Sequence, residues 1–137
     1  MYPEQLVIPM REELTRLGFR ELKSVQEVDQ AVTQGEGPTL LVVNSVCGCA
    51  AGSARPGVAL ALKAEPHPAP LVTVFAGQDQ EATARARSYL KGYAPSSPSM
   101  ALLKDGQVLW MLERHQIEGR DPASIASLLS QAFAKHC

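Results

Sequence analysis

Cys47 and Cys49 are separated by a single glycine and lie where an apolar run gives way to a stretch of small residues. The run over residues 39–46 is rich in β-branched side chains, which is typical of a buried strand, and the residues from Ala50 to Arg55 are typical of the start of a helix. The unpaired N–H groups and the dipole of a helix start favour an anion, so a thiol there loses its proton more easily. This position predicts thiol redox chemistry.

Two other interpretations of the cysteine pair remain open. Free cysteine is often a small buried hydrophobe, and cysteine can also bind a metal such as zinc. A metal site needs further ligands, and the remaining donors show no tight ligand spacing to the pair: His67, His115, His136 and Cys137. The position before a helix favours catalysis, so we expect no bound metal. We expect Cys137 to be a frayed terminal thiol without a resolving role.

The elements around the pair alternate between helices and strands. Apolar residues at helical spacing predict a helix over 3–17 that stops at Gly18, and Ser24 with Glu27 has the capping-box spacing for a second helix. The other expected elements are a short strand at 19–22, a turn at 35–38, strands at 39–46 and 71–75, a helix at 79–89, a hairpin with strands at 99–103 and 108–112, and a last helix opened by Asp121 and Pro122.

This order of elements predicts one α/β domain over residues 1–137. Helices that alternate with strands and are followed by a hairpin give a mixed central β-sheet with helices on both faces. That is the arrangement of a thioredoxin-like fold, here with an extra N-terminal helix.

The composition excludes several classes of function. The net charge is −1 with acidic and basic residues interspersed, and aromatic residues make up only 5%, so we expect no nucleic-acid partner. No apolar run approaches membrane-spanning length and no secretory signal is recognisable, so we expect no membrane partner either. Three cysteines are too few for a disulfide scaffold. We expect a cytoplasmic protein in a reducing compartment.

The sequence NSVCGCAAG at residues 44–52, followed by ARP at 54–56, resembles the signature of the bacilliredoxins. These are thioredoxin-like proteins with a CGC motif, from bacteria that use the small thiol bacillithiol. Similarity to the family continues at residues 2–3 (YP), 10–14 (MREEL) and 18–19 (GF), so that it covers nearly the whole chain.

The resemblance implies that the protein removes bacillithiol from mixed disulfides on oxidised proteins. Cys47 would attack the mixed disulfide and release the client thiol, and Cys49 or free bacillithiol would resolve the adduct. The partners would be bacillithiolated or disulfide-containing client proteins, with bacillithiol as a thiol co-substrate and no further cofactor. Gly57 stands where the family leads us to expect alanine, a difference that concerns helix packing rather than chemistry.

The order of the residues agrees with these roles. Cys47 is nearer the end of the strand and is expected to be the more accessible thiol, so we predict that it is the attacker with the lower pKa. Gly48 removes a side chain where a sulfur-bearing substrate must approach, and glycine permits unusual backbone angles. A disulfide across one residue closes a tighter ring than in a CxxC motif, so it should be easily reduced.

Ser97-Pro98 is predicted to be the second part of the site. Pro98 stands immediately before the hairpin, where a thioredoxin fold carries a cis-proline that faces the redox cysteines. A cis bond exposes the backbone of Ser97 for strand-like pairing with a substrate peptide. Pro95 is the lesser candidate for this role.

Three further polar residues have both a structural and a functional interpretation. Asn44 and Ser45 either satisfy hydrogen bonds within the sheet or orient backbone and water beside the thiols. No carboxylate occupies residues 39–46, which favours a monothiol route over efficient dithiol reduction. Arg55 either offers positive charge to an anionic substrate, such as the malate group of bacillithiol, or is solvated on the helix surface.

Three alternative functions remain. The nearest is a general protein disulfide isomerase or thiol-disulfide reductase, which prefers an ordinary protein disulfide to a mixed bacillithiol disulfide. The second is a non-catalytic module that carries a metal or sulfur species, which stoichiometric metal in the purified protein would indicate. The third is a scaffold whose thiols are incidental, in which Cys47→Ser would abolish no activity.

Overall fold

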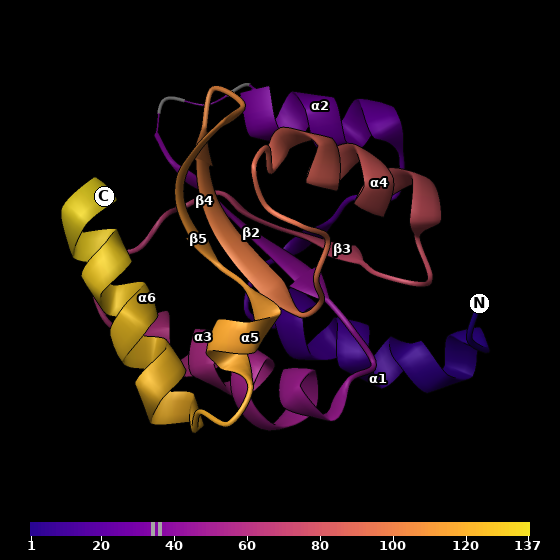
Figure 1. Ribbon diagram of the computed structural model, residues 1–137, viewed down its shortest axis with the longest axis horizontal. Coiled ribbons are helices and arrows are strands. Elements are labelled where there is room, and N and C mark those ends of the chain that lie inside the picture. Colours follow the sequence, from indigo (N-terminus) through magenta and orange to yellow (C-terminus); the bar gives the residue numbers. More distant parts are fainter. Residues whose placement is uncertain (34, 36) are drawn as a thin grey trace.

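A computed structural model describes residues 1–33, 35 and 37–137 and shows a five-stranded sheet between two layers of helices (Figure 1). The spatial order of the strands is β1-β3-β2-β4-β5. The strands β1, β2 and β3 are parallel, β4 runs antiparallel to β2, and β5 runs antiparallel to β4. The mixed sheet, the helices on both faces and the extra N-terminal helix of the expected thioredoxin-like fold are confirmed.

The strands are β1 (Arg20–Glu21), β2 (Thr39–Asn44), β3 (Leu71–Phe75), β4 (Ser99–Lys104) and β5 (Gln107–Leu112). The helices are α1 (Glu4–Thr15), α2 (Val25–Thr33), the π-helical turn η1 (Ala50–Ala54), α3 (Arg55–Ala61), α4 (Gln80–Tyr89), α5 (Arg114–Ile117) and α6 (Pro122–His136).

The central strand β2 separates two hydrophobic cores. Leu40 and Val42 pack into one core with side chains of α1, α3, α5 and α6, whereas Leu41 and Val43 pack into the other with side chains of α2 and α4. Successive side chains of a strand point to opposite faces, so a run that is apolar throughout fits a strand covered on both sides. Figure 1 shows α2 and α4 together on one side of the sheet and α3 and α6 on the other.

Several element ends follow from local hydrogen bonds that the sequence predicts. Gly18 takes a left-handed conformation (φ +102°) just beyond α1. The Ser24 hydroxyl accepts from the N–H of Glu27 at 3.1 Å, and the Asp121 carboxylate accepts from the N–H of Ser124 at 2.8 Å. Within the predicted turn at 35–38, Glu36 lies outside the described residues.

The hairpin and the helix that precedes it also carry distinct local features. The turn between β4 and β5 has positive φ at both Asp105 and Gly106, as a type I′ turn requires. Asp79 precedes α4 but does not cap it, because the Arg11 guanidinium holds both carboxylate oxygens at 2.7 and 3.0 Å.

Three features differ from the expectation or were not foreseen. The central strand ends at Asn44 rather than at residue 46. The helix that follows begins with a π-helical turn, and the short helix α5 lies between the hairpin and α6. All three lie close to the cysteine pair in the chain or in space, and they shape the site described below.

Gly57 allows α3 and α6 to approach one another closely. A Cβ atom at this position would lie 2.5 Å from both Cβ and Cγ2 of Ile125 and 3.2 Å from the carbonyl oxygen of Pro122. The two distances to Ile125 are shorter than a real carbon contact allows, so glycine is required by packing and not by backbone conformation.

Candidate functional site

The segment Cys47–Gly48–Cys49, called the thiol motif below, forms the start of the helix after β2. Helical conformation begins at Gly48, and the Cys47 carbonyl accepts from the N–H groups of Ala50 at 2.9 Å and Ala51 at 3.3 Å. Cys47 therefore occupies the N-cap position, where a side-chain acceptor can take up the otherwise unpaired N–H groups of the first turn.

The two sulfur atoms of the thiol motif lie 2.7 Å apart, and both side chains are half-buried. The pKa of Cys47 is lowered from its ordinary value of 9.0, chiefly because the Cys49 thiol donates to its sulfur. The N–H groups of Cys49 and Ala50 and the positive charge of Arg114 lower it further, against the opposing effect of burial. Donors and a cation that favour the thiolate make a cysteine nucleophilic.

Cys49 has the opposite environment. Its pKa is raised from 9.0, first by burial and then by its interaction with the Cys47 sulfur, which holds the proton on Cys49. The charge of Arg114 lowers this pKa and that of Glu118 raises it. One proton is therefore shared unequally, and Cys47 is the thiol that ionises first.

Arg55 lies beneath the thiol motif rather than on the surface. Its side chain is 2% exposed, and it donates to Glu13 at 3.0 Å and to both the Asn44 side-chain oxygen and the Ser45 carbonyl at 2.9 Å. The prediction that Arg55 offers its charge to a substrate does not fit this position, because the guanidinium is enclosed and its partners belong to the protein. Arg55 is not solvated either.

Asn44 and Ser45 complete this buried network. The Asn44 amide nitrogen donates to the carbonyl of Met10 at 3.1 Å, and its oxygen accepts from the N–H of Ser45 at 2.9 Å. The Ser45 hydroxyl in turn accepts from the N–H of Cys47 at 3.0 Å. Asn44 is buried and is occupied by these partners, so it supports the backbone that leads to Cys47 and does not reach a substrate.

Gly48 is exposed and helical, with no positive φ, so the unusual backbone angles expected of it are not observed. Apart from its chain neighbours and its own helix, no atom of the described residues lies within 4 Å of the position of a Cβ there. The space beside Gly48, between the two cysteines, is thus open.

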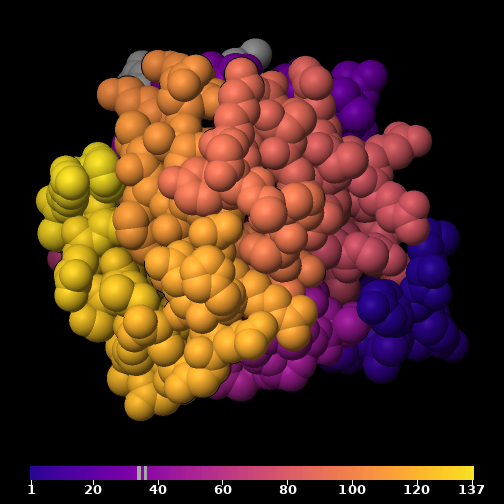
Figure 2. Space-filling model, viewed as in Figure 1, coloured from indigo at the N-terminus to yellow at the C-terminus, as the bar shows by residue number. Residues whose placement is uncertain are grey.

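Ser97-Pro98 has the expected cis peptide bond. Ser99, the next residue, pairs with Val43 near the end of β2, so this proline lies at the same end of the sheet as the thiol motif. A second cis bond, Glu65-Pro66, lies in the loop before β3, and the Pro95 alternative is not cis. In Figure 2 orange surface from the later part of the chain meets magenta surface from its middle part.

Arg114, at the start of α5, was not identified from the sequence. Its side-chain nitrogen Nη1 donates to the Ser97 carbonyl at 3.3 Å, and its backbone N–H donates to the Ser96 hydroxyl at 3.4 Å. Its positive charge acts on both thiols. A helix of four residues carries no apolar period, so the only available signal was the capping box that Glu113 forms with Gln116.

Arg87 holds the same loop from α4. It donates to the Ser96 carbonyl at 3.4 Å, while its buried Nε has no partner among the described residues. Burial lowers the pKa of this guanidinium. Two arginines from different elements thus contact the loop in front of Pro98.

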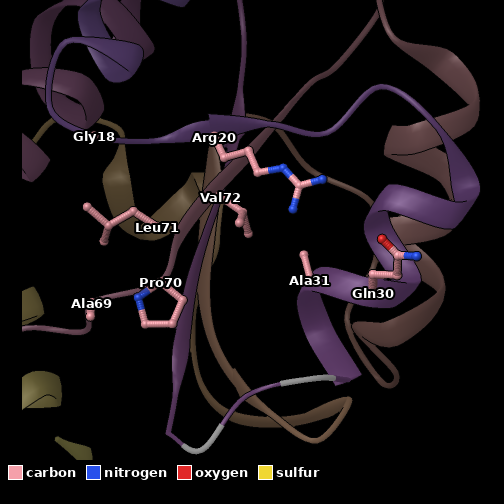
Figure 3. Close-up of a pocket in the computed structure, with 8 residues that line it drawn as sticks. All are labelled: Gly18, Arg20, Gln30, Ala31, Ala69, Pro70, Leu71 and Val72. Carbon is pink, nitrogen blue, oxygen red and sulfur yellow. The ribbon is translucent and has the colours of Figure 1, made fainter.

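A hollow of the described surface lies elsewhere. It measures about 400 Å³ and is formed between β1, α2 and the start of β3, with Arg20 and Gln30 extending toward it (Figure 3). Because β2 and β3 are parallel and the thiol motif follows the end of β2, this hollow lies at the opposite end of the sheet. None of the predicted site residues lines it.

Comparison with solved structures identifies the fold. Residues covering 84% of this chain superpose on 90% of a thioredoxin from Malassezia sympodialis with a TM-score of 0.57 and 14% sequence identity. The chain is thus a thioredoxin-fold protein with a CGC thiol pair at the start of a helix.

The family follows from the sequence comparisons. The family model described as disulphide isomerase matches residues 2–137. The chain is 53% identical to a bacilliredoxin of Koribacter versatilis, 54% to one of Bacillus licheniformis and 52% to one of Staphylococcus epidermidis. Each match covers at least 99% of this chain and 94% or more of the relative. The chain belongs to this bacilliredoxin family.

The family and the fold support a role in thiol-disulfide redox chemistry. Among the described residues, no three His, Cys, Asp or Glu side chains are grouped so that they could hold a metal ion together. No helix in the described ranges is both long and apolar enough to cross a membrane.

Proposed function

We propose that the protein removes bacillithiol from mixed disulfides on oxidised proteins, with Cys47 as the nucleophile. The observation that carries this proposal is the position of Cys47, whose sulfur receives donors from the first helical turn and lies 2.7 Å from the sulfur of Cys49. A thiol whose pKa is lowered forms more thiolate, and the thiolate is the form that attacks a disulfide sulfur.

The exchange proceeds in two displacement steps. The Cys47 thiolate attacks the bacillithiol sulfur, the mixed disulfide breaks, and the client leaves as a thiolate that takes up a proton. Bacillithiol is then bound to Cys47 through a new disulfide. In one route Cys49 attacks the Cys47 sulfur, which forms the Cys47–Cys49 disulfide and releases bacillithiol. In the other route a free bacillithiol thiolate attacks the bound bacillithiol, which releases bacillithiol disulfide and regenerates the Cys47 thiolate. A cellular thiol or reductase supplies the electrons that reduce the Cys47–Cys49 disulfide back to the two thiols.

The raised pKa of Cys49 favours resolution by the external thiol. A thiol must ionise before it attacks, and Cys49 is held protonated by burial and by its neighbour. The buried charged group beneath the thiol motif is the guanidinium of Arg55, not a carboxylate that could accept the Cys49 proton. These features support a monothiol route.

General disulfide isomerase or reductase activity is the second candidate. It is favoured by the two sulfurs lying within reach of one another and by the match to the disulphide isomerase family. In that case Cys47 would attack a disulfide between two protein cysteines, and the backbone of Ser97 would pair with the client chain.

Mass spectrometry after incubation with a bacillithiolated model protein tests the proposal. We expect the Cys49→Ser variant to carry bacillithiol on Cys47 while the client is released, and the Cys47→Ser variant to carry none. If neither variant takes up bacillithiol but both the wild type and Cys49→Ser exchange with an ordinary protein disulfide, the second candidate replaces the first. Stoichiometric metal in the freshly purified protein would favour the carrier function instead.

A further inference from the structure

Arg114 connects the two halves of the candidate site. Its guanidinium donates to the carbonyl of Ser97, in front of the cis-proline, and its charge acts on the sulfurs of both Cys47 and Cys49. Ser99 pairs with Val43 near the end of β2, which leads to the thiol motif, so Arg114 contacts the segment at the same end of the sheet as Cys47.

The guanidinium of Arg114 retains capacity to bind a ligand. Its side chain is 44% exposed, its Nε pairs with Glu118 at 2.5 Å, and Nη1 donates to Ser97. Its other terminal nitrogen, Nη2, makes no hydrogen bond to the residues that the structure describes. By contrast, Arg55 and Arg11 are buried and held by several protein acceptors.

Glu118 competes for the same cation. It is 53% exposed and pairs with Nε of Arg114. A carboxylate on a substrate can replace a solvent-exposed carboxylate of the protein at little cost, because both form the same charge-assisted hydrogen bonds. The Arg114–Glu118 pair thus resembles an anion site that is closed by a weakly held internal group.

We propose that Arg114 selects mixed disulfides in which the small thiol carries a carboxylate, and that it directs Cys47 to the sulfur of that small thiol. This inference rests on the proposed exchange and names its specificity-determining residue. A mixed disulfide contains two sulfurs, and attack on the wrong one would bind the client protein to Cys47 and release the small thiol. A carboxylate held by Arg114 places the small-thiol sulfur next to Cys47, so that the bond to the client is the one that breaks.

The atoms balance in the directed step. The Cys47 thiolate forms a bond to the small-thiol sulfur, and the electron pair of the broken bond leaves on the client sulfur, which is then protonated. The carboxylate stays ionised throughout, and Glu118 is released to solvent. No oxidant or reductant is consumed in this step.

A series of three small thiols tests this proposal without reliance on bacillithiol. One model protein with a single cysteine is converted to mixed disulfides with 3-mercaptopropionate, 2-mercaptoethanol and cysteamine, which carry one negative charge, none and one positive charge. The Cys49→Ser protein traps the adduct on Cys47. Mass spectrometry then measures the rate of adduct formation and the ratio of small-thiol adduct to client adduct.

We expect the carboxylate substrate to react with the lowest KM and to give mainly the small-thiol adduct. We call the ratio of the rates of adduct formation with the carboxylate and the neutral substrate the carboxylate advantage. In an Arg114→Gln background this advantage should fall by roughly five-fold, the ratio that corresponds to about 1 kcal/mol for an exposed ion pair. The carboxylate-to-neutral rate ratio is compared between variants, so the intrinsic reactivity of each disulfide and any general effect of Arg114 on the thiol pKa cancel. Glu118→Gln should increase the advantage, because the competing carboxylate is lost.

Arg16→Gln is the matched control. Arg16 is an exposed residue on α1 whose side chain pairs with Glu12, so its loss changes the net charge equally but away from the thiols. Unchanged substrate ratios and adduct ratios in Arg114→Gln would overturn the inference about Arg114. If Cys47 still formed adducts in that case, the proposed function would remain. Failure of the Cys49→Ser protein to form any adduct on Cys47 with all three substrates and with the bacillithiolated model protein would instead overturn the proposed function.

Discussion

Cys47 and Cys49 are chemically identical, and the direction in which each pKa moves is set by what surrounds each sulfur. Cys47 lies at the N-cap and receives hydrogen bonds, whereas Cys49 lies within the first turn and donates one. Donation by the Cys49 thiol is the largest contribution to the lowered pKa of Cys47. The donor at position 49 therefore controls how much Cys47 thiolate is present at neutral pH.

Replacing this donor should shift the titration of Cys47. In a Cys137→Ser background, Cys49→Ser keeps a hydroxyl donor, whereas Cys49→Ala has none. We expect the pKa of Cys47 to be higher in the alanine variant than in the serine variant, and its alkylation at neutral pH to be correspondingly slower. The ultraviolet absorbance of the thiolate, followed against pH, measures this. Equal pKa values in the two variants would show that the backbone N–H groups and Arg114 dominate.

Arg55 has a structural effect on Cys47 at the scale of a single side chain. Its guanidinium holds the Asn44 oxygen and the Ser45 carbonyl, and Ser45 accepts from the Cys47 N–H. Arg55→Met would leave these buried acceptors without their charged donor. We expect a loss of about 3 kcal/mol in the free energy of unfolding, measured with urea.

A smaller loss in Arg55→Lys would support the importance of the charge, since lysine keeps the cation but lacks the fork that reaches both acceptors. A change of less than about 1 kcal/mol in Arg55→Met would contradict the network's structural role. Val46→Ala, a change of a half-buried side chain in the same turn, offers a comparison for the effect of local substitution alone.

At the scale of elements, the contact between α3 and α6 depends on Gly57. Gly→Ala in a helix interior ordinarily stabilises by about 1 kcal/mol. At Gly57 the new Cβ would overlap Ile125, so we expect Gly57→Ala to destabilise the protein by about 1–3 kcal/mol. Thermal or urea unfolding measures the change.

Gly52 is the matched control for this prediction. It lies in the π-helical turn, and outside its own helix no atom of the described residues lies within 4 Å of a Cβ there. Gly52→Ala should leave stability unchanged or raise it by up to about 1 kcal/mol. Stabilisation by Gly57→Ala as well would mean that the two helices move apart readily.

The elements show which parts of the structure the sequence could predict. Long patterned segments such as α6 and the β4–β5 hairpin were predicted, because periodicity and turn residues are local signals. The four residues of α5 are too few to carry a period, so Arg114 was missed. The strand over 39–46 was predicted two residues too long, because Ser45 bonds to Asn44 and Arg55 instead of to a neighbouring strand.

Among the site residues, position in the chain was more informative than side-chain orientation. The helix start after β2 and the cis bond before β4 follow from the order of elements and were predicted. The burial of Arg55 was not, because the segment around it is small and apolar on most sides and gives no indication of which face turns inward. Such contacts depend on residues distant in the chain, here Glu13 and Asn44.

At the scale of the whole molecule, two buried arginines attach α1 to the rest of the fold. Arg11 on α1 binds Asp79, Glu21 and Glu4, and Arg55 on α3 binds Glu13 on α1. Arg11 also stacks over the ring of Phe75, with its guanidinium carbon 5.2 Å from the ring centre. The N-terminal helix is thus held by charges as well as by its apolar residues.

This arrangement predicts loss of stability in acid. The pKa of Glu4 is lowered from 4.5, through hydrogen bonds from Gln78 and Arg11, and that of Asp29 is lowered from 3.8, mainly by Arg85. A carboxyl group with a lower pKa in the folded state stabilises the protein above its unfolded pKa, and this contribution is lost as the pH falls through the folded value. The urea midpoint should therefore decline as the pH is lowered below about 4.5.

Glu4→Gln should make that decline less steep, because one of the titrating groups is removed. The comparison is made at equal ionic strength, since salt weakens exposed ion pairs. A midpoint that stays constant between pH 5 and pH 3, or the same slope in Glu4→Gln, would contradict the prediction.

The π-helical turn η1 fixes the register between the reactive and the supporting residues. The N–H of Arg55 reaches back five residues to the carbonyl of Ala50, so the turn holds one residue more than an α-helical turn. Each residue rotates an α-helix by about 100°. The widened turn takes up its extra residue without adding this rotation to α3, so Arg55 stays within reach of Asn44. The reactive thiols and the residues that support them thus keep their register although the chain between them is one residue longer.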